Sequence, residues 1–188
     1  MLNPLHLFRL LAQEEVEVVL VDGVAMIVQG VTHDTNDIDL CYRRTAANME
    51  RLVRAILPLN PRLRVEGLTD DEARLLPWHF DVHVLAPMET LTLMTDAGAV
   101  DLVATLSGIG DYEAIRDDIV DVDLDGLTMP VLTLRAIISN KRAAARDKDI
   151  AALPRIEATL RLREIMAERA TNHEAGGSEH DDTAPCGE

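Results

Sequence analysis

The sequence is poor in aromatic residues and has no long apolar run. Only five of the 188 residues are aromatic, which argues against recognition of single-stranded nucleic acid by base stacking. The most apolar stretch, residues 16–28, is interrupted by Asp22 and Gly23, so no segment is predicted to span a membrane. The first residues lack the basic and small-residue pattern of a secretory signal. Together these absences predict a cytoplasmic protein.

Cysteine and positive charge are also scarce. Cys41 lies in an apolar segment and Cys186 in a polar tail, so neither a disulfide nor a thiolate metal site is expected. The net charge of −15 argues against bulk electrostatic binding of nucleic acid. Residues 135–169 are the exception, with nine basic and five acidic side chains. This region is either a solvated helix surface or a basic wall that faces an anionic ligand.

What the chain does contain is a regular alternation of helix and strand signals, with 47% apolar residues to form a core. Strands are expected at 16–21, 37–42, 79–86, and in two hairpins, 90–95 with 99–106 and 118–124 with 127–132. Helices are expected from Pro4, at 23–30, after Thr45 over 46–58, after Thr133 over 134–146, and at about 149–170 with Pro154 near the first turn. Residues 58–78 are expected to be irregular.

This order of elements predicts an α+β fold, with helices packed on a mixed sheet and a C-terminal helical bundle. We expect residues 1–132 to form the core and 133–170 a C-terminal helical part. Residues 171–188 lack an apolar pattern and are expected to be a disordered acidic tail.

Two aspartates two residues apart, Asp37 and Asp39, lie in the second predicted strand. Alternate residues of a strand point to the same face, so the two carboxylates are expected side by side. Like charges at this spacing repel, and burial raises the cost. A divalent cation would remove the repulsion, and Mg²⁺ prefers oxygen ligands of this kind. The alternative is a half-exposed strand with two surface aspartates.

The surroundings favour the metal interpretation. Gly23, between a strand and a helix, would let backbone amides approach a phosphate group. A third carboxylate from a neighbouring strand would complete a two-metal site for phosphoryl transfer. Asp101 in 99–106 is the first candidate for that carboxylate, and Asp81 in 79–86 is the second.

The segment 20-LVDGVAMIVQGVTHDTNDIDL-40 resembles the signature of the nucleotidyltransferase superfamily, whose fold is shared with DNA polymerase β. The resemblance is closer to the AbiEii-type branch, which includes type IV toxin nucleotidyltransferases and the MenT toxins. That branch carries a G-x-x-R-x-T-x-D-I-D run and a later K-x-x-x-x-R-x-K-D run. Their counterparts here are Gly30, Thr35, Asp37, Ile38 and Asp39, then Lys141, Arg146, Lys148 and Asp149.

The resemblance implies transfer of a nucleoside monophosphate from an NTP. Asp37 and Asp39 would hold Mg²⁺ on the triphosphate, and Asp101 would complete the metal site or accept the proton of the attacking hydroxyl. Lys141 would reach the triphosphate from the helical part. The remaining positions expected to contact the nucleotide are Gly23, Thr35, Arg146 and Asp149.

Three positions depart from the family pattern. Asp22 stands where the first glycine of a pair is usual, Val24 offers no hydroxyl to a phosphate, and His33 replaces the arginine. An acid beside a triphosphate is unfavourable unless it points away or joins a metal, and His33 removes a cationic contact near neutral pH.

Three functions therefore remain open. The first is a toxin of a toxin–antitoxin system that modifies tRNA, at its 3′ end, blocks translation and is neutralised by a cognate antitoxin. The second is an enzyme of the same fold that acts on a small hydroxylated molecule such as an aminoglycoside, which the net charge of −15 suits better than tRNA. The third is a binding module that keeps the fold without catalysis.

Overall fold

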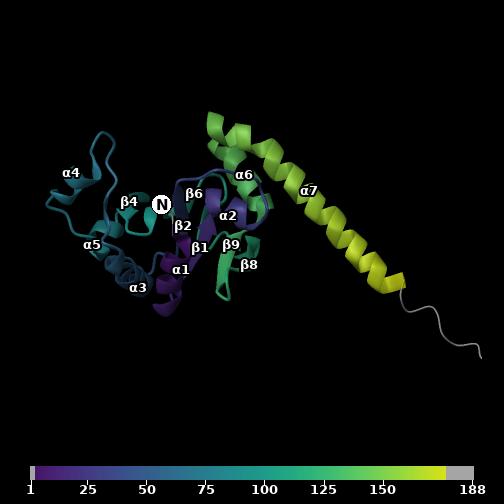
Figure 1. Ribbon diagram of the computed structural model, residues 1–188, viewed down its shortest axis with the longest axis horizontal. Coiled ribbons are helices and arrows are strands. Elements are labelled where there is room, and N and C mark those ends of the chain that lie inside the picture. Colours follow the sequence, from purple (N-terminus) through teal and green to yellow (C-terminus); the bar gives the residue numbers. More distant parts are fainter. Residues whose placement is uncertain (1–2, 177–188) are drawn as a thin grey trace, which may run out of the picture.

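A seven-stranded mixed sheet is the centre of the computed structural model, which describes residues 3–176 (Figure 1). Its strands lie in the order β3-β4-β5-β2-β1-β9-β8. Their bounds are β1 Val18–Val21, β2 Asp37–Tyr42, β3 Arg62–Leu63, β4 Thr90–Thr95, β5 Gly98–Val103, β8 Ile119–Asp123 and β9 Thr128–Leu132. β2 runs parallel to β5, and β1 to β9, while the other neighbours are antiparallel. A separate two-stranded sheet joins β6 Thr105–Leu106 to β7 Gly110–Asp111.

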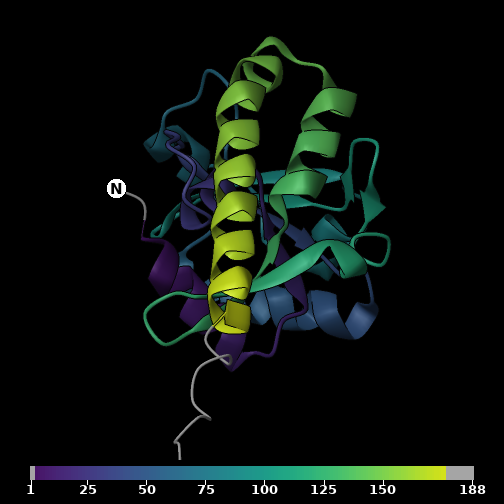
Figure 2. The same cartoon turned by 90° about the vertical axis from the view of Figure 1, so that its right-hand side faces the viewer.

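Helices pack around this sheet and confirm the expected α+β fold. They are α1 Pro4–Gln13, α2 Asp22–Val28, α3 Ala46–Ile56, α4 Asp70–Arg74, α5 Val82–Leu85, α6 Leu134–Ala144 and α7 Asp147–Gly176, with short 3₁₀ turns at Leu57–Leu59 and Arg116–Asp118. The hydroxyls of Thr45 and Thr133 accept hydrogen bonds from the first turns of α3 and α6, as expected of cap residues. Figure 2 shows α6 and α7 side by side.

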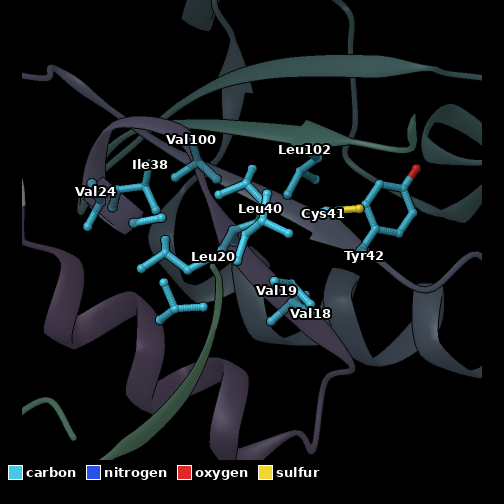
Figure 3. Close-up of a cluster of buried hydrophobic side chains, with 14 of the residues drawn as sticks. Val18, Val19, Leu20, Val24, Ile38, Leu40, Cys41, Tyr42, Val100 and Leu102 are labelled. Atoms are coloured by element: carbon cyan, nitrogen blue, oxygen red, sulfur yellow. The ribbon is translucent and has the colours of Figure 1, made fainter. Parts of the chain in front are cut away.

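The alternation along β2 separates the core from the polar face of the sheet. Ile38 and Leu40 are fully buried among apolar side chains of β1 and β5, including Leu20, Val100 and Leu102 (Figure 3). The intervening residues of β2 point to the opposite face, where Asp37 and Asp39 are partly exposed and Cys41, farther along the strand, is fully buried. The burial of Ile38 and Leu40 therefore sets the face on which the two aspartates lie.

Three sequence expectations were wrong. Residues 79–86 do not form a strand, because Asp81 caps the short helix α5 by accepting a hydrogen bond from the Val84 amide. Residues 58–78 are not wholly irregular, since they contain β3 and α4. Helix α7 begins at Asp147 and continues to Gly176, so Pro154 lies inside it and the expected tail does not begin at residue 171. The rest of that tail, 177–188, lies outside the described residues.

Within residues 3–176, no helix is long and apolar enough to cross a membrane.

Candidate active site

Three carboxylates lie on the same face of the sheet. Asp39 on β2 stands opposite Asp101 on the parallel neighbour β5, and Asp37 lies two residues before Asp39 on the same face. Burial, followed by the charges of Asp22, Asp37 and Asp101, raises the pKa of Asp39 to about 8. Burial and the charge of Asp37 also raise the pKa of Asp101. The negative charges of these carboxylates repel one another, and a bound cation would relieve that repulsion.

Arg64 lies close to two of these carboxylates, Asp37 and Asp101, and was not predicted from the sequence. Its guanidinium Nη1 lies 3.6 Å from Asp37 Oδ2 and 3.9 Å from Asp101 Oδ1. Arg64 follows β3, and its amide donates to the carbonyl oxygen of Thr92, the β4 residue paired with Asp101. A strand signal at 62–63 would have placed it here, but two residues are too short for a periodic pattern to show.

The turn from β1 into α2 orients Asp37. Thr35 donates a hydrogen bond to Asp37 Oδ1 at 2.7 Å. Gly23 lies directly against Thr35, because a Cβ added at Gly23 would come within 2.5 Å of the Thr35 Oγ1. The glycine is therefore required for the close approach of two chain segments that hold the carboxylate in place.

Lys141 lies in a buried cluster of charges. Its ammonium donates to Asp22 Oδ1 at 2.5 Å and to Asp149 Oδ1 at 3.0 Å, while Arg146 Nε donates to Asp149 Oδ2 at 2.5 Å. Burial acts to raise the pKa of Asp149, but the hydrogen bonds from Arg146 and Lys141 outweigh it and the pKa is lowered. Asp149 is fully buried and holds both cations, so it fixes the connection between α6 and α7.

A cavity of about 320 Å³ joins these groups. Of the residues selected from sequence, six line it: Gly23, Thr35, Asp37, Asp39, Lys141 and Asp149. Asp101 and Arg146 do not line it but contact residues that do. Lys148, Asp34 and Arg64 line it from exposed positions, and Asp22 lines it from a partly buried one. The alternative carboxylate, Asp81, caps α5 and is not in the lining.

His33 also lines this cavity, at the position of the expected family arginine. Burial, followed by the charge of Lys141, lowers its pKa from the ordinary value of 6.5. A pKa below 6.5 leaves the imidazole mostly neutral at pH 7, so we do not expect His33 to supply the positive charge of an arginine at this position.

The carboxylate oxygens of this site are of the chemical type that a hard divalent cation binds. Asp101 Oδ1 is buried and finds no hydrogen-bond donor in the described part of the chain. Carboxylate oxygens that accept no hydrogen bond are available as ligands, and Mg²⁺ prefers oxygen ligands of this kind. Among the described residues, however, no three His, Cys, Asp or Glu side chains are already gathered as a metal site. Binding of a cation would therefore require the carboxylates to draw together.

Comparison with known proteins gives the fold. No protein-family model and no curated protein sequence matches the chain. Among solved structures, it is similar to the crystal structure of ANT(2″)-Ia in complex with adenylyl-2″-tobramycin, with a TM-score of 0.54, 12% identity and coverage of 93% of this chain and 97% of that one. The solution structure of antibiotic-resistance factor ANT(2″)-Ia matches with a TM-score of 0.53 and 14% identity, covering 95% of this chain and 96% of that one. The chain therefore has the fold of a nucleotidyltransferase.

Proposed function

We propose that the protein is a divalent-metal-dependent nucleotidyltransferase that moves a nucleoside monophosphate from an NTP to a hydroxyl group. The observation that carries the proposal is the set of facing carboxylates on β2 and β5, with the pKa of Asp39 raised to about 8. Buried like charges cost stability unless a ligand uses them. The shared fold supports this reading.

The residues have separate roles in this proposal. Asp37, Asp39 and Asp101 would hold the cation, which when bound supplies charge neutralisation and polarises the reacting phosphate. Thr35 orients Asp37 through its hydrogen bond. Lys141, held in place by Asp149, would place a positive charge beside the phosphates. The chain contributes positioning and electrostatic stabilisation to an in-line displacement, as phosphoryl transfer requires.

We propose that the acceptor is tRNA and that the protein acts as the toxin of a toxin–antitoxin system. The two sequence runs around Asp37 and Lys141 support this, as do basic side chains beside the acidic cavity. Arg64 and Lys148 line it, and Arg155 is close enough to His33 to help lower its pKa. Such side chains suit the phosphates of a nucleic acid end. A cognate antitoxin would then be the expected protein partner.

A small cationic acceptor is the second candidate. It is favoured by the acidic lining of the cavity, which includes Asp22, Asp34, Asp37 and Asp39. Acids attract the amino groups of an aminoglycoside and repel a phosphate chain. The matched ANT(2″)-Ia structure contains an adenylylated tobramycin.

One assay separates these candidates. The purified protein is incubated with Mg²⁺, each NTP labelled on its α-phosphate, and either total tRNA or an aminoglycoside panel. Label on intact tRNA, with none on tRNA whose 3′-terminal ribose was oxidised with periodate before the reaction, supports the tRNA proposal. Label on an aminoglycoside supports the second candidate and contradicts the first. No label on any acceptor contradicts the proposed transfer activity.

A further inference from the structure

Asp22 accepts a hydrogen bond from the Lys141 ammonium at the surface of the cavity. Both partners of the lysine line the 320 Å³ cavity, but the Asp22 side chain is 25% exposed, whereas the Asp149 side chain is fully buried. A ligand that enters this cavity therefore meets the Asp22 carboxylate at the place where it would contact Lys141. The lysine itself is only 5% exposed in its side chain.

The charges of this cluster already balance. Lys141 and Arg146 supply two positive charges, and Asp22 and Asp149 supply two negative ones, all joined by hydrogen bonds of 2.5–3.0 Å. A buried cation that is fully paired offers little attraction to an incoming anion. A phosphate can bind Lys141 strongly only if Asp22 gives up its place.

The backbone and the surroundings of Asp22 allow this exchange. Asp22 has φ of +50°, a left-handed conformation that Asp and Asn adopt more readily than most residues. Asp22 also lines a second cavity of about 270 Å³, whose lining includes Arg146, Thr90 and Asn140. A displaced carboxylate would remain among polar groups and near the half-exposed Arg146 guanidinium, so leaving Lys141 does not strand a buried charge.

We propose that Asp22 is a specificity-determining residue whose carboxylate competes with phosphate oxygens for Lys141. Only a ligand with enough negative charge to displace Asp22, such as a triphosphate, gains the lysine contact. This inference rests on the proposed function only in taking the anion to be the phosphate chain of a nucleotide. In this proposal the Asp22 carboxylate competes with the ligand for Lys141. A variant that removes the charge of Asp22 therefore tests it.

The test is a binding measurement that does not depend on transfer. Isothermal titration calorimetry compares the wild type with Asp22→Asn, using inorganic triphosphate without metal and ATP with Mg²⁺. Asn keeps the shape and tolerates the left-handed backbone. Loss of a charge-assisted competitor is expected to tighten triphosphate binding by about 10-fold or more. Asp22→Gly, which also accepts φ of +50°, is the second variant if Asp22→Asn does not fold.

Two controls distinguish competition for Lys141 from a general effect of removing negative charge from the cavity. Asp34→Asn removes one exposed carboxylate from the same cavity lining, without touching Lys141, and should give a clearly smaller gain. The double variant Asp22→Asn with Lys141→Gln keeps Arg146 and Asp149 paired and should bind no more tightly than the wild type.

The inference is overturned if removing the Asp22 carboxylate leaves triphosphate binding unchanged or weaker, or if the gain survives without Lys141. A gain as large in Asp34→Asn would also overturn it. Tighter binding in Asp22→Asn, with no transfer to any acceptor, would support the inference while contradicting the proposed function.

Discussion

Asp39 and Asp101 face each other across two adjacent parallel strands, β2 and β5. Side chains in register on neighbouring strands share one face of the sheet and lie close together. Asp101 Oδ1 has no hydrogen-bond donor among the described residues, and the pKa of Asp39 is raised to about 8. This pairing is unfavourable for the protein alone and favourable for a protein that binds a cation.

The first prediction is that Asp39→Asn stabilises the metal-free protein at neutral and higher pH. The folded protein raises the pKa of Asp39 from 3.8 to about 8, so between these values it binds a proton that the unfolded chain releases. Stability from this group is thus present below the unfolded pKa and is lost as pH rises toward the folded value. Asn carries no charge and removes that loss. Thermal unfolding in EDTA should give a Tm advantage that grows from about pH 5 to about pH 8.

Asp71→Asn is the matched control, because Asp71 is an exposed acid on α4 outside the cavity lining. It should leave both Tm and its pH dependence close to those of the wild type. If Asp39→Asn behaves like this control, the carboxylates on β2 and β5 do not strain the fold.

The second prediction concerns the contact between Gly23 and Thr35. Gly23→Ala would place a Cβ 2.5 Å from Thr35 Oγ1 and 2.7 Å from Thr35 Cβ, so one of the two segments must shift. Overpacking of this kind costs about 1–3 kcal/mol, and the shift would also disturb the hydrogen bond from Thr35 to Asp37. Chemical denaturation should show the loss of stability, and the transfer assay a lower rate.

Gly67→Ala separates steric overlap from backbone strain. Gly67 has φ of +85° and open space around its Cβ position, so alanine there costs only the left-handed conformation, about 1–2 kcal/mol. It should lose some stability but keep the transfer rate. A Gly23→Ala protein that also keeps the full rate would contradict the role given to Thr35.

The third prediction distinguishes the two lysines. Lys141→Ala should lower the transfer rate by roughly 30-fold to 1000-fold, because one charge contact in the transition state contributes about 2–4 kcal/mol. It should also lower stability, since it leaves Asp22 and Asp149 with Arg146 as their nearest cation. Lys141→Arg should rescue the rate only in part, because a planar guanidinium does not replace a compact ammonium.

Lys148→Ala is the comparison, since Lys148 lines the same cavity from an exposed position and has no ion pair among the described residues. It should lose much less activity and almost no stability. Steady-state rates and Tm values of the two alanine variants are measured side by side. Equal losses, or a larger loss at Lys148, would contradict the assignment of Lys141.

The sequence predicted the parts of this site that have a strong local pattern. Alternation along residues 37–42 placed Asp37 and Asp39 on one face, and the cap at Thr133 set the helix that carries Lys141. It did not predict Arg64, because β3 is two residues long and is held by pairing with β4.

The partner of Lys141 depended on contacts between distant parts of the chain. Asp22 and Lys141 are 119 positions apart, and only packing of α6 against α2 brings them together. In residues 79–86, by contrast, a local hydrogen bond overrides the predicted strand. Their alternation suggested a strand, yet Asp81 satisfies the amide of Val84 and starts a helix instead.

The most direct test of the central claim is nucleotidyl transfer with an NTP labelled on either its α- or its γ-phosphate. In the presence of Mg²⁺ and the acceptor that the labelling assay selects, the wild type should transfer the α label and never the γ label. Asp37→Asn and Asp39→Asn should each abolish transfer while remaining folded, as judged by circular dichroism. Near wild-type transfer by either variant at saturating Mg²⁺, or transfer of the γ label, would contradict the assignment of these carboxylates to a nucleotidyltransferase site.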